Sequence, residues 1–288
     1  MSVASTRKNI HLTIRVEIYR NAFLRFALQS CAMHKFIFFN RQIVPAENAF
    51  LAATSSAALY GRGIFTTVAV HDFVPFLWEK HWHRLTDHAQ KIGIDLTEFS
   101  EDTIFKSLLE IIEKNNLTHG RARLTFYDES PSFVWQTISK SRTNLLIQTA
   151  DFRHIPAEFR LTVSPYRINS TSPLAGVKSC NYLENILALE DARARGFDEA
   201  VRLNERGEIV SACMANIFWK KDRVIYTPPL ATGCLNGTTR GFVLENFTVE
   251  ERKANLAELD AADEIFLTSA GIGGVNCKFE NDEKIITK

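Results

Sequence analysis

The stretch KSCNYLENILALEDARARGFDEAVRLNERGEIV, residues Lys178–Val210, decides the fold class. Its first part predicts a helix from about Asn181 to Arg195, with Gly196 as an ordinary C-terminal stop. Its second part has β-forming residues on both sides of a polar turn at residues 204–207, which is typical of a hairpin. A helix that leads into a hairpin favours a mixed α+β fold.

The rest of the chain repeats these elements. An opening hairpin is predicted over residues 35–44, with its turn at Asn40-Arg41, and a strand over Ile64–Val70. Helices are predicted over Glu79–Ile92 and near Thr103–Lys114. Further strands and hairpins are predicted in RARLTFYD, TNLLIQTA, RLTVSPY, NIFWKKDRVIYTP and ADEIFLTSAGIGGV, the last of which runs into a Gly-rich loop. The pattern predicts two α+β halves that are rich in hairpins.

A polar segment with a proline, residues 151–158, is the predicted domain junction. It gives a small domain over residues 33–152 and a larger domain over residues 153–288. Residues 1–32 carry five Lys or Arg residues and one acid. A basic leader of this kind is either a targeting segment or an extension before a true start at Met33, and we expect the latter.

The composition argues against several classes of protein. The net charge is +1, so no global field favours nucleic acid or an anionic membrane. No apolar run reaches the roughly 18 residues that span a bilayer. The five cysteines are dispersed and form no C-x-x-C pair, which argues against a disulfide framework or a zinc site. We therefore expect a protein of the reducing cytoplasm, in which local charge still permits a binding site for a small anion.

The motif LNGTTRGF, residues 235–242, predicts the start of a helix with Asn236 as its cap. The free N–H groups of a helix N-terminus bind anions, and the hydroxyls of Thr238 and Thr239 would add donors. The alternative is an ordinary capped helix.

Two other polar features have ordinary explanations from the residues alone. His81, Arg84 and His88 share one face of the helix predicted over residues 79–92, and such a face is expected to be solvated. Lys178 lies between a loop and a helix. A lysine there is usually exposed, but a partly buried lysine with a lowered pKa forms Schiff bases.

The chain resembles the class IV, or fold-type IV, pyridoxal-phosphate (PLP) enzymes. These include branched-chain aminotransferases, D-amino-acid aminotransferases and aminodeoxychorismate lyases. The matching stretches run in order from about Met33 to Val275 and include YGRGIFTTVAV, HWHRL, the stretch that begins at Lys178, ANIFWKKDRVIYTPPLATGCLNGTTR and DEIFLTSA. The resemblance implies a two-domain fold, PLP as the cofactor, carried by the larger domain, and a homodimer.

The resemblance also implies roles for individual residues. Lys178 matches the Schiff-base lysine, which also moves protons at the substrate. Arg84 in HWHRL matches the arginine that binds the cofactor phosphate. The rest of the phosphate site and the neighbouring cofactor contact are expected from Gly237, Thr238, Thr239 and Asn216.

One position departs from the family pattern. The family has a glutamate five residues before the asparagine of the NIF motif, where it keeps the pyridine nitrogen protonated. This chain has Ser211 there. Glu208 is close in sequence, but an offset of three in a strand points it to the opposite face unless a bulge intervenes. A serine at the cofactor implies a weaker electron sink, which handicaps transamination more than a single elimination.

Within the family, the motifs resemble aminodeoxychorismate lyase most closely, which releases pyruvate and leaves para-aminobenzoate for folate synthesis. Lys178 and Thr67 would then be catalytic, and Thr66, Arg121 and Arg123 would contact the substrate. A structural role for the threonines and arginines stays open. The alternatives are an aminotransferase for D- or branched-chain amino acids, which needs an oxo-acid acceptor, and a non-catalytic paralogue that binds the cofactor.

Overall fold

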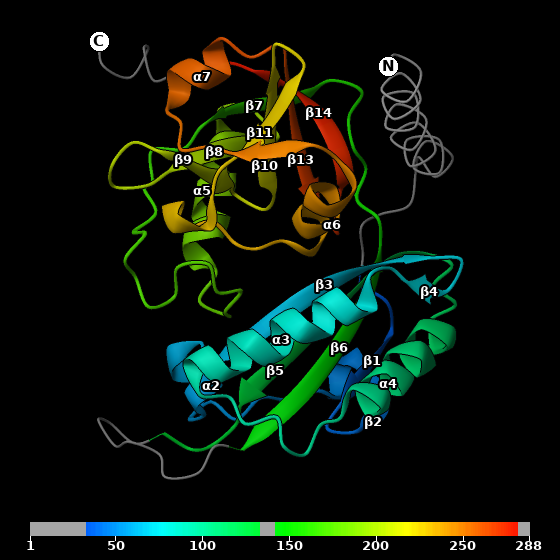
Figure 1. The fold of residues 1–288 in the computed structure, drawn as a ribbon. Helices are drawn as coiled ribbons and strands as arrows, with labels where there is room; N and C mark the ends of the chain where they lie inside the picture. The colour runs from blue at the N-terminus through cyan, green and yellow to red at the C-terminus, as the bar shows by residue number, and fades with distance from the viewer. Residues whose placement is uncertain (1–32, 133–141, 282–288) are drawn as a thin grey trace.

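The computed structural model describes residues 33–132 and 142–281, which form two β-sheets with helices packed against them (Figure 1). The first sheet has six strands in the order β2-β1-β6-β5-β3-β4. Its strands are β1 (Phe36–Phe39), β2 (Gln42–Pro45), β3 (Gly63–His71), β4 (Val74–Pro75), β5 (His119–Asp128) and β6 (Thr143–Asp151). Every neighbouring pair is antiparallel.

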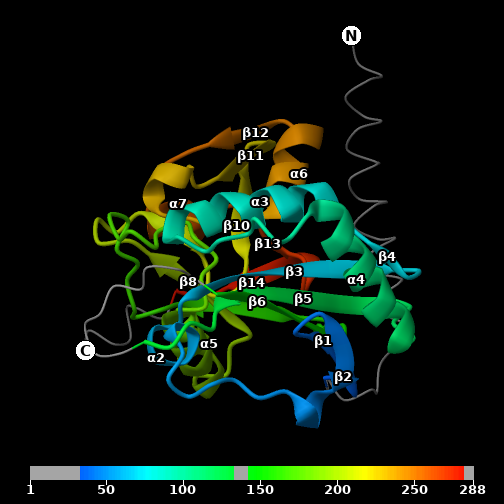
Figure 2. The same ribbon diagram turned by 90° about the horizontal axis from the view of Figure 1, so that it is seen from below.

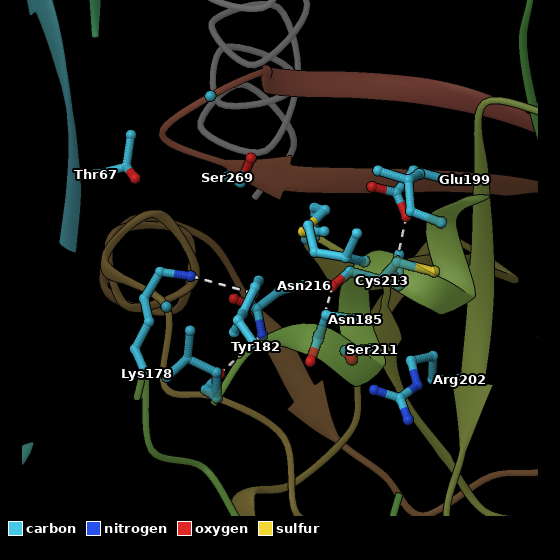
Figure 3. Close-up of a pocket in the computed structure, with 18 of the residues that line it drawn as sticks. Thr67, Lys178, Tyr182, Asn185, Glu199, Arg202, Ser211, Cys213, Asn216 and Ser269 are labelled. Atoms are coloured by element: carbon cyan, nitrogen blue, oxygen red, sulfur yellow. Dashed lines mark hydrogen bonds between the residues drawn. The ribbon is translucent and has the colours of Figure 1, made fainter. Parts of the chain in front are cut away.

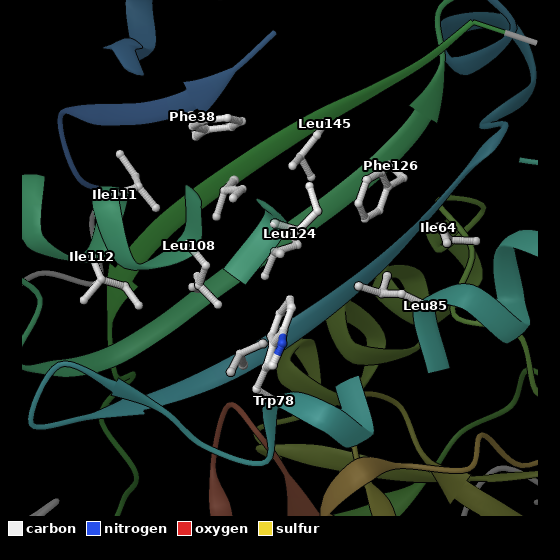
Figure 4. Packing of buried hydrophobic residues seen from close by; sticks show 14 of the residues in the cluster. Phe38, Ile64, Trp78, Leu85, Leu108, Ile111, Ile112, Leu124, Phe126 and Leu145 are labelled. Atoms are coloured by element: carbon white, nitrogen blue, oxygen red, sulfur yellow. The ribbon is translucent and has the colours of Figure 1, made fainter. Parts of the chain in front are cut away.

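Two helices cover one face of this sheet, α3 (Trp78–Ile92) and α4 (Glu101–Lys114). Figure 4 shows their apolar side chains against the strands, with Leu85 of α3 and Leu108 of α4 facing Leu124 and Phe126 of β5. Burying side chains of this size stabilises the fold by about 1.5–3 kcal/mol each. The short elements η1 (Ala46–Asn48) and α2 (Ser56–Tyr60) join β2 to β3.

The second sheet has eight strands in the order β12-β11-β10-β13-β14-β7-β8-β9. Its strands are β7 (Phe159–Val163), β8 (Glu199–Leu203), β9 (Ile209–Ala212), β10 (Asn216–Lys221), β11 (Val224–Thr227), β12 (Val249–Glu251), β13 (Glu264–Ser269) and β14 (Gly273–Phe279). The helices of this half are α5 (Leu183–Ala194), η2 (Leu230–Thr232), α6 (Thr238–Asn246) and α7 (Leu256–Asp260). Figure 2 shows α6 next to α3, where Lys80 and Glu245 form an ion pair.

The start of β3 links the two sheets. Its partner β4 covers only the far end of the strand, at Val70–His71. The loop before α5 pairs with the free end instead, since Phe65 N–H donates to the Lys178 carbonyl at 2.9 Å and Cys180 N–H donates to the Gly63 carbonyl at 2.8 Å. This pairing holds Lys178 against the first sheet.

Most of the predicted elements are confirmed, including the α+β class, the hairpins and the helices α3 to α6. The turn at Asn40-Arg41 has positive φ at both residues, as a type I′ hairpin turn requires. Two details were wrong. The cap of α6 is Gly237 rather than Asn236. The predicted Gly-rich loop after β13 is shorter than expected, because strand β14 begins at Gly273.

The predicted domain junction, residues 151–158, lies between the last strand of the first sheet and the first strand of the second. The expected leader, residues 1–32, lies outside the described residues. In the described part of the chain, no helix is both long and apolar enough to cross a membrane.

Candidate active site

A cavity of about 1030 Å³ opens between the two sheets and brings the predicted site residues together. Its wall includes residues of β3 and β5, the loop before α5, the β8–β9 hairpin and the start of α6. All the predicted residues except Thr66 line it: Thr67, Arg84, Arg121, Arg123, Lys178, Ser211, Asn216, Gly237, Thr238 and Thr239. Figure 3 shows Lys178 and Ser211 on separate elements of this wall.

The backbone of Lys178 is fixed on both sides. Its N–H donates to Nδ1 of His88 at 3.0 Å, and its carbonyl accepts from β3. Burial and the nearby charge of Arg84 lower the pKa of His88 to about 4, so the imidazole is neutral and can accept. These contacts aim the Lys178 side chain at the cavity.

The Lys178 amine lies in a cationic and aromatic environment. Nζ donates to the Tyr182 hydroxyl at 3.2 Å and lies 4.5 Å from the centre of the Phe65 ring. Burial lowers the pKa of Lys178 well below its usual value, and the charges of Arg84 and Arg123 add to the effect. Burial also raises the pKa of Tyr182 to about 12, so its hydroxyl keeps its proton. A lysine with a lowered pKa is available as a nucleophile and as a base.

Arg84 is the charged residue of an anion site beside Lys178. Nη2 donates to Thr66 Oγ1 at 2.7 Å and Nη1 donates to the Asn236 carbonyl at 3.4 Å. Burial lowers the pKa of Arg84 to about 10, which leaves it charged at neutral pH. Among the described residues, its buried Nε has no hydrogen-bond partner, so this one N–H is left without an acceptor.

The start of α6 supplies the other half of the anion site. The first N–H groups of a helix have no partner within the helix and favour negative charge. Gly237 is required at the cap, because a Cβ there would come within 2.0 Å of Asn216 Oδ1. Asn216 Nδ2 in turn donates to the Leu235 carbonyl at 2.8 Å and fixes the loop that leads into the helix.

The polar face of α3 is buried, so the expectation that it would be solvated was wrong. His81, Arg84 and His88 are 2%, 8% and 3% exposed. His81 joins the two halves of the anion site, with Nδ1 at 2.6 Å from Thr66 Oγ1 and Nε2 at 3.2 Å from Thr238 Oγ1. Burial lowers the pKa of His81 well below its usual value, so it is neutral.

Thr66 and Thr67 lie on opposite faces of β3, as neighbouring residues of a strand do. Thr67 lines the cavity. Thr66 is fully buried beneath Arg84, where it cannot reach a substrate in the cavity. The expected substrate contact is therefore corrected to a contact that holds Arg84.

The two predicted arginines of β5 face the cavity. Arg123 is paired with Thr67 across the strands, and its guanidinium lies 3.7 Å from the centre of the Phe65 ring. Arg121 lies two residues away on the same face and also lines the cavity. The wall as a whole has seven arginines and one lysine against three acidic residues, and it is strongly cationic.

Ser211 lines the cavity on β9, whereas Glu208 does not. A bulge is present, since Arg202 pairs with Ser211 and Leu203 pairs with Ile209, which leaves Val210 unpaired. It does not redirect Glu208, whose carboxylate binds Asn204 and Arg206 in the hairpin turn. Glu208 therefore does not replace the missing glutamate.

Another carboxyl of the cavity wall, Glu199, was not predicted. Oε2 accepts from the Cys213 N–H at 2.9 Å, and Oε1 has no partner among the described residues. Burial raises the pKa of Glu199 to about 7, although Arg153 opposes the shift. Tyr182, His81 and His88 were also missed as site residues.

The site fits a phosphorylated cofactor bound beside Lys178. Arg84 Nε lacks an acceptor, and Thr238 and Thr239 at the start of α6 line the same cavity as Lys178. A cationic side chain, hydroxyls and helix N–H groups are the donors that a phosphate requires.

Comparison with known proteins gives the family. The model of the class IV amino-transferases matches residues 63–278. The chain is 28% identical over 243 residues to an aminodeoxychorismate lyase of Bacillus subtilis, across 81% of this chain and 83% of that protein. It is 30% identical over 258 residues to a putative branched-chain-amino-acid aminotransferase of Methanocaldococcus jannaschii, across 87% of this chain and 89% of that protein.

Solved structures of both kinds share the fold. The branched-chain amino acid aminotransferase of Escherichia coli superposes with a TM-score of 0.80 at 25% identity, over 87% of each chain. A putative 4-amino-4-deoxychorismate lyase of Legionella pneumophila superposes with a TM-score of 0.74 at 28% identity, over 83% of this chain and 89% of that chain. The chain therefore belongs to the class IV aminotransferases, a family of PLP-dependent enzymes with the fold-type IV architecture.

Proposed function

We propose that this enzyme is an aminodeoxychorismate lyase, which eliminates pyruvate from its substrate and leaves para-aminobenzoate for folate synthesis. Both products are carboxylates, so the substrate carries two carboxylate groups. The cationic wall of the cavity supports this assignment, because Arg121, Arg123 and Arg153 line the same space as Lys178. Carboxylates favour arginine partners, whereas a branched aliphatic side chain favours an apolar wall.

The cofactor site is proposed from the same geometry. Lys178 would hold PLP covalently, and Arg84, Thr238 and Thr239 would bind its phosphate at the start of α6. Asn216 and Gly237 would shape the phosphate site, and Ser211 would face the other end of the ring. PLP, when bound, withdraws electrons from the carbon that carries the substrate amine.

The proposed elimination needs a base and an acid. Lys178 would act as the base that takes the proton from the carbon carrying the nitrogen. PLP, when bound, would supply the electron sink for this C–H bond. Loss of the proton and cleavage of the C–O bond would make the substrate ring aromatic, and the enol that leaves would take up a proton at carbon to become pyruvate. Thr67 donates a proton to the departing oxygen, and Arg121 and Arg123 hold the carboxylates. Thr67 and Arg123 are paired across β3 and β5, and this supports their combined roles.

An aminotransferase for branched-chain or D-amino acids is the second candidate. The 30% identity to a putative branched-chain-amino-acid aminotransferase favours it. It would require a second substrate, an oxo-acid, to take up the amino group. Ser211 in the cavity wall weighs against it, because a serine stabilises a protonated pyridine less than a carboxylate does.

Two assays of the PLP-loaded protein separate the candidates. A lyase releases pyruvate from aminodeoxychorismate at the same rate with or without an added oxo-acid. Activity that appears only when an oxo-acid is supplied would refute the lyase and favour the aminotransferase. Arg123→Gln is expected to raise KM for the dicarboxylate about tenfold or more, whereas Arg41→Gln, an exposed residue of the β1–β2 turn, serves as the matched control.

The assembly is proposed to be a homodimer. Large apolar side chains are exposed on the loop before α2, on α2 and on α5, including Phe50 at 77%, Tyr60 at 52% and Leu183 at 67%. A second copy of the chain would cover them. Leu183→Glu should shift the sedimentation of the protein toward the monomer, whereas Val74→Glu, an exposed residue of β4, should not. A single monomeric species in the unmodified protein would refute the dimer.

The compartment and the domain division are proposed as well. The four cysteines in the described residues are free, which supports the reducing cytoplasm. The change of sheet between β6 and β7 supports a small domain over residues 33–152 and a cofactor-binding domain over residues 153–288. Limited proteolysis that cut first within residues 152–158 would agree with this division, and resistance of this segment would count against it.

A further inference from the structure

Arg202 is a buried arginine next to the last residue of β8, directly across from Ser211. The two residues are paired between antiparallel strands, so their side chains lie on the same face of the sheet. The Arg202 side chain is only 2% exposed, and both residues line the cavity that contains Lys178. Figure 3 shows Arg202 and Ser211 together, apart from Lys178 and Tyr182.

The protein does not use all the donors of this arginine. Nε donates to the Tyr166 carbonyl at 3.5 Å, and Nη2 donates to the Arg167 carbonyl at 3.4 Å and to Glu184 at 3.3 Å. These contacts are long. Within residues 33–132 and 142–281, neither Nη1 nor the Ser211 hydroxyl has a protein partner. A buried guanidinium with free donors needs an acceptor from elsewhere.

Two of the three carboxyls near this pair point away from it. Glu208 is bound in the hairpin turn by Asn204 and Arg206. Glu199 lies three residues before Arg202 on the same strand, an odd offset that turns it to the other face, and it accepts from Cys213. Glu184 contacts Arg202, but its side chain is 77% exposed. Among the described residues, the carboxylate that reaches this pair is therefore the exposed Glu184, at Nη2 of Arg202, and none is bound to the Ser211 hydroxyl.

We propose that Arg202, together with Ser211, binds the pyridine nitrogen of PLP and keeps it unprotonated. This inference rests on the PLP-dependent function proposed above, in which Ser211 faces that end of the ring. A guanidinium can only donate, so the ring nitrogen must accept and cannot carry a proton of its own. The positive charge of Arg202 disfavours a pyridinium as well.

The consequence for the chemistry is that the cofactor would be a weaker electron sink. An unprotonated pyridine withdraws fewer electrons than a pyridinium. The proposed elimination tolerates this, because the electrons leave with the C–O bond. Transamination must hold the same electrons until the cofactor carbon takes up a proton, so Arg202 and Ser211 would select against it.

The test uses the full-length protein loaded with PLP that carries ¹⁵N at the ring nitrogen. The ¹⁵N resonance is expected at the position of an unprotonated pyridine throughout the neutral pH range. The double variant Arg202→Leu, Ser211→Glu places a carboxylate beside the nitrogen and is expected to move the resonance to the position of a pyridinium. The same double variant should gain transamination relative to elimination.

The outcomes separate this inference from the function on which it rests. A pyridinium resonance in the unmodified protein would overturn the inference and leave the PLP-dependent function intact. If Glu199→Gln then removed the pyridinium signal, Glu199 rather than Arg202 would be the partner of the nitrogen. A protein that binds no PLP would refute the proposed function itself, and the inference with it.

Discussion

Nδ1 of His81 lies 2.6 Å from Oγ1 of Thr66, and this contact sets the direction of the hydrogen bonds behind the anion site. Arg84 can only donate, so the oxygen of Thr66 accepts from it and the proton of Thr66 is directed to His81. Nδ1 then accepts, and the N–H of the neutral imidazole is at Nε2, which donates to Thr238. The proton of the Thr238 hydroxyl is left for a phosphate in the cavity.

Replacing His81 should therefore weaken cofactor binding. His81→Leu leaves Thr238 free to turn its hydroxyl away and leaves Thr66 without its acceptor. The loss of about one or two hydrogen bonds predicts about tenfold weaker binding of PLP, measured by equilibrium titration of the apoprotein. His83→Leu, at an exposed position of the same helix, is the control. Equal affinities in the two variants would contradict the hydrogen-bond chain.

The cap of α6 gives a second test at the phosphate site. Gly237→Ala would bring a Cβ within 2.0 Å of Asn216 Oδ1, so either Asn216 or the helix start must move. We expect weaker binding of PLP and of inorganic phosphate, measured by calorimetry. Gly241→Ala, in the same helix, meets no atom within 4 Å and should instead stabilise the protein by about 0.5–1 kcal/mol. Equal affinities of Gly237→Ala and Gly241→Ala for PLP and for phosphate would contradict the requirement for glycine at the cap.

The neighbouring threonines of β3 should have separable effects. Thr67→Val removes the proposed proton donor and is expected to lower kcat about 100-fold while the affinity for PLP is unchanged. Thr66→Val removes the acceptor of Arg84 and should weaken PLP binding, with a smaller effect on turnover of the loaded enzyme. Steady-state kinetics and cofactor titration of both variants check this. If Thr66→Val lowered kcat and Thr67→Val weakened PLP binding instead, the roles assigned to the two faces of β3 would be wrong.

Glu199 should make stability depend on pH. Its pKa is raised from 4.5 to about 7 in the folded protein, so the unfolded chain loses this proton first as the pH rises. The contribution of Glu199 to the free energy of unfolding is complete below about pH 4.5 and falls by about 3 kcal/mol as the pH approaches 7. Glu199→Gln removes this dependence.

The measurement for Glu199 is the difference between the urea-unfolding free energies of the unmodified protein and Glu199→Gln across this pH range. His81 and His88 oppose the trend, because their lowered pKa values cost stability as the pH falls, but both proteins contain them and the subtraction cancels them. A difference that does not change with pH would mean that folding does not raise the pKa of Glu199.

The sequence predicted the positions of the helices and strands better than it predicted which face of each is buried. Alternation and turn residues were sufficient for β1, β3 and the hairpins. Alternation alone could not tell which of Thr66 and Thr67 faces the cavity, since that depends on the packing of α3 against β3. His81 and His88 were expected to be solvated, because the partners that bury them come from α6 and from the loop before α5, distant in the sequence.

Tyr182 and Arg202 differ in how clearly the sequence indicated that they belong to the site. Tyr182 stands four residues after Lys178 in the stretch that decided the fold, so its place at the amine could have been suspected from spacing. Arg202 gave the opposite signal, because a charged residue within a strand usually faces solvent. Only the pairing with Ser211 and the burial of the side chain mark it as part of the site.

The central claim is that Lys178 binds the cofactor, and borohydride reduction tests it most directly. The PLP-loaded protein is reduced, digested and analysed by mass spectrometry, with Lys178→Ala as the control. We predict a phosphopyridoxyl group on Lys178 and loss of the visible absorbance band in the variant. A band that persists unchanged in Lys178→Ala, or a label on another lysine, would contradict the account.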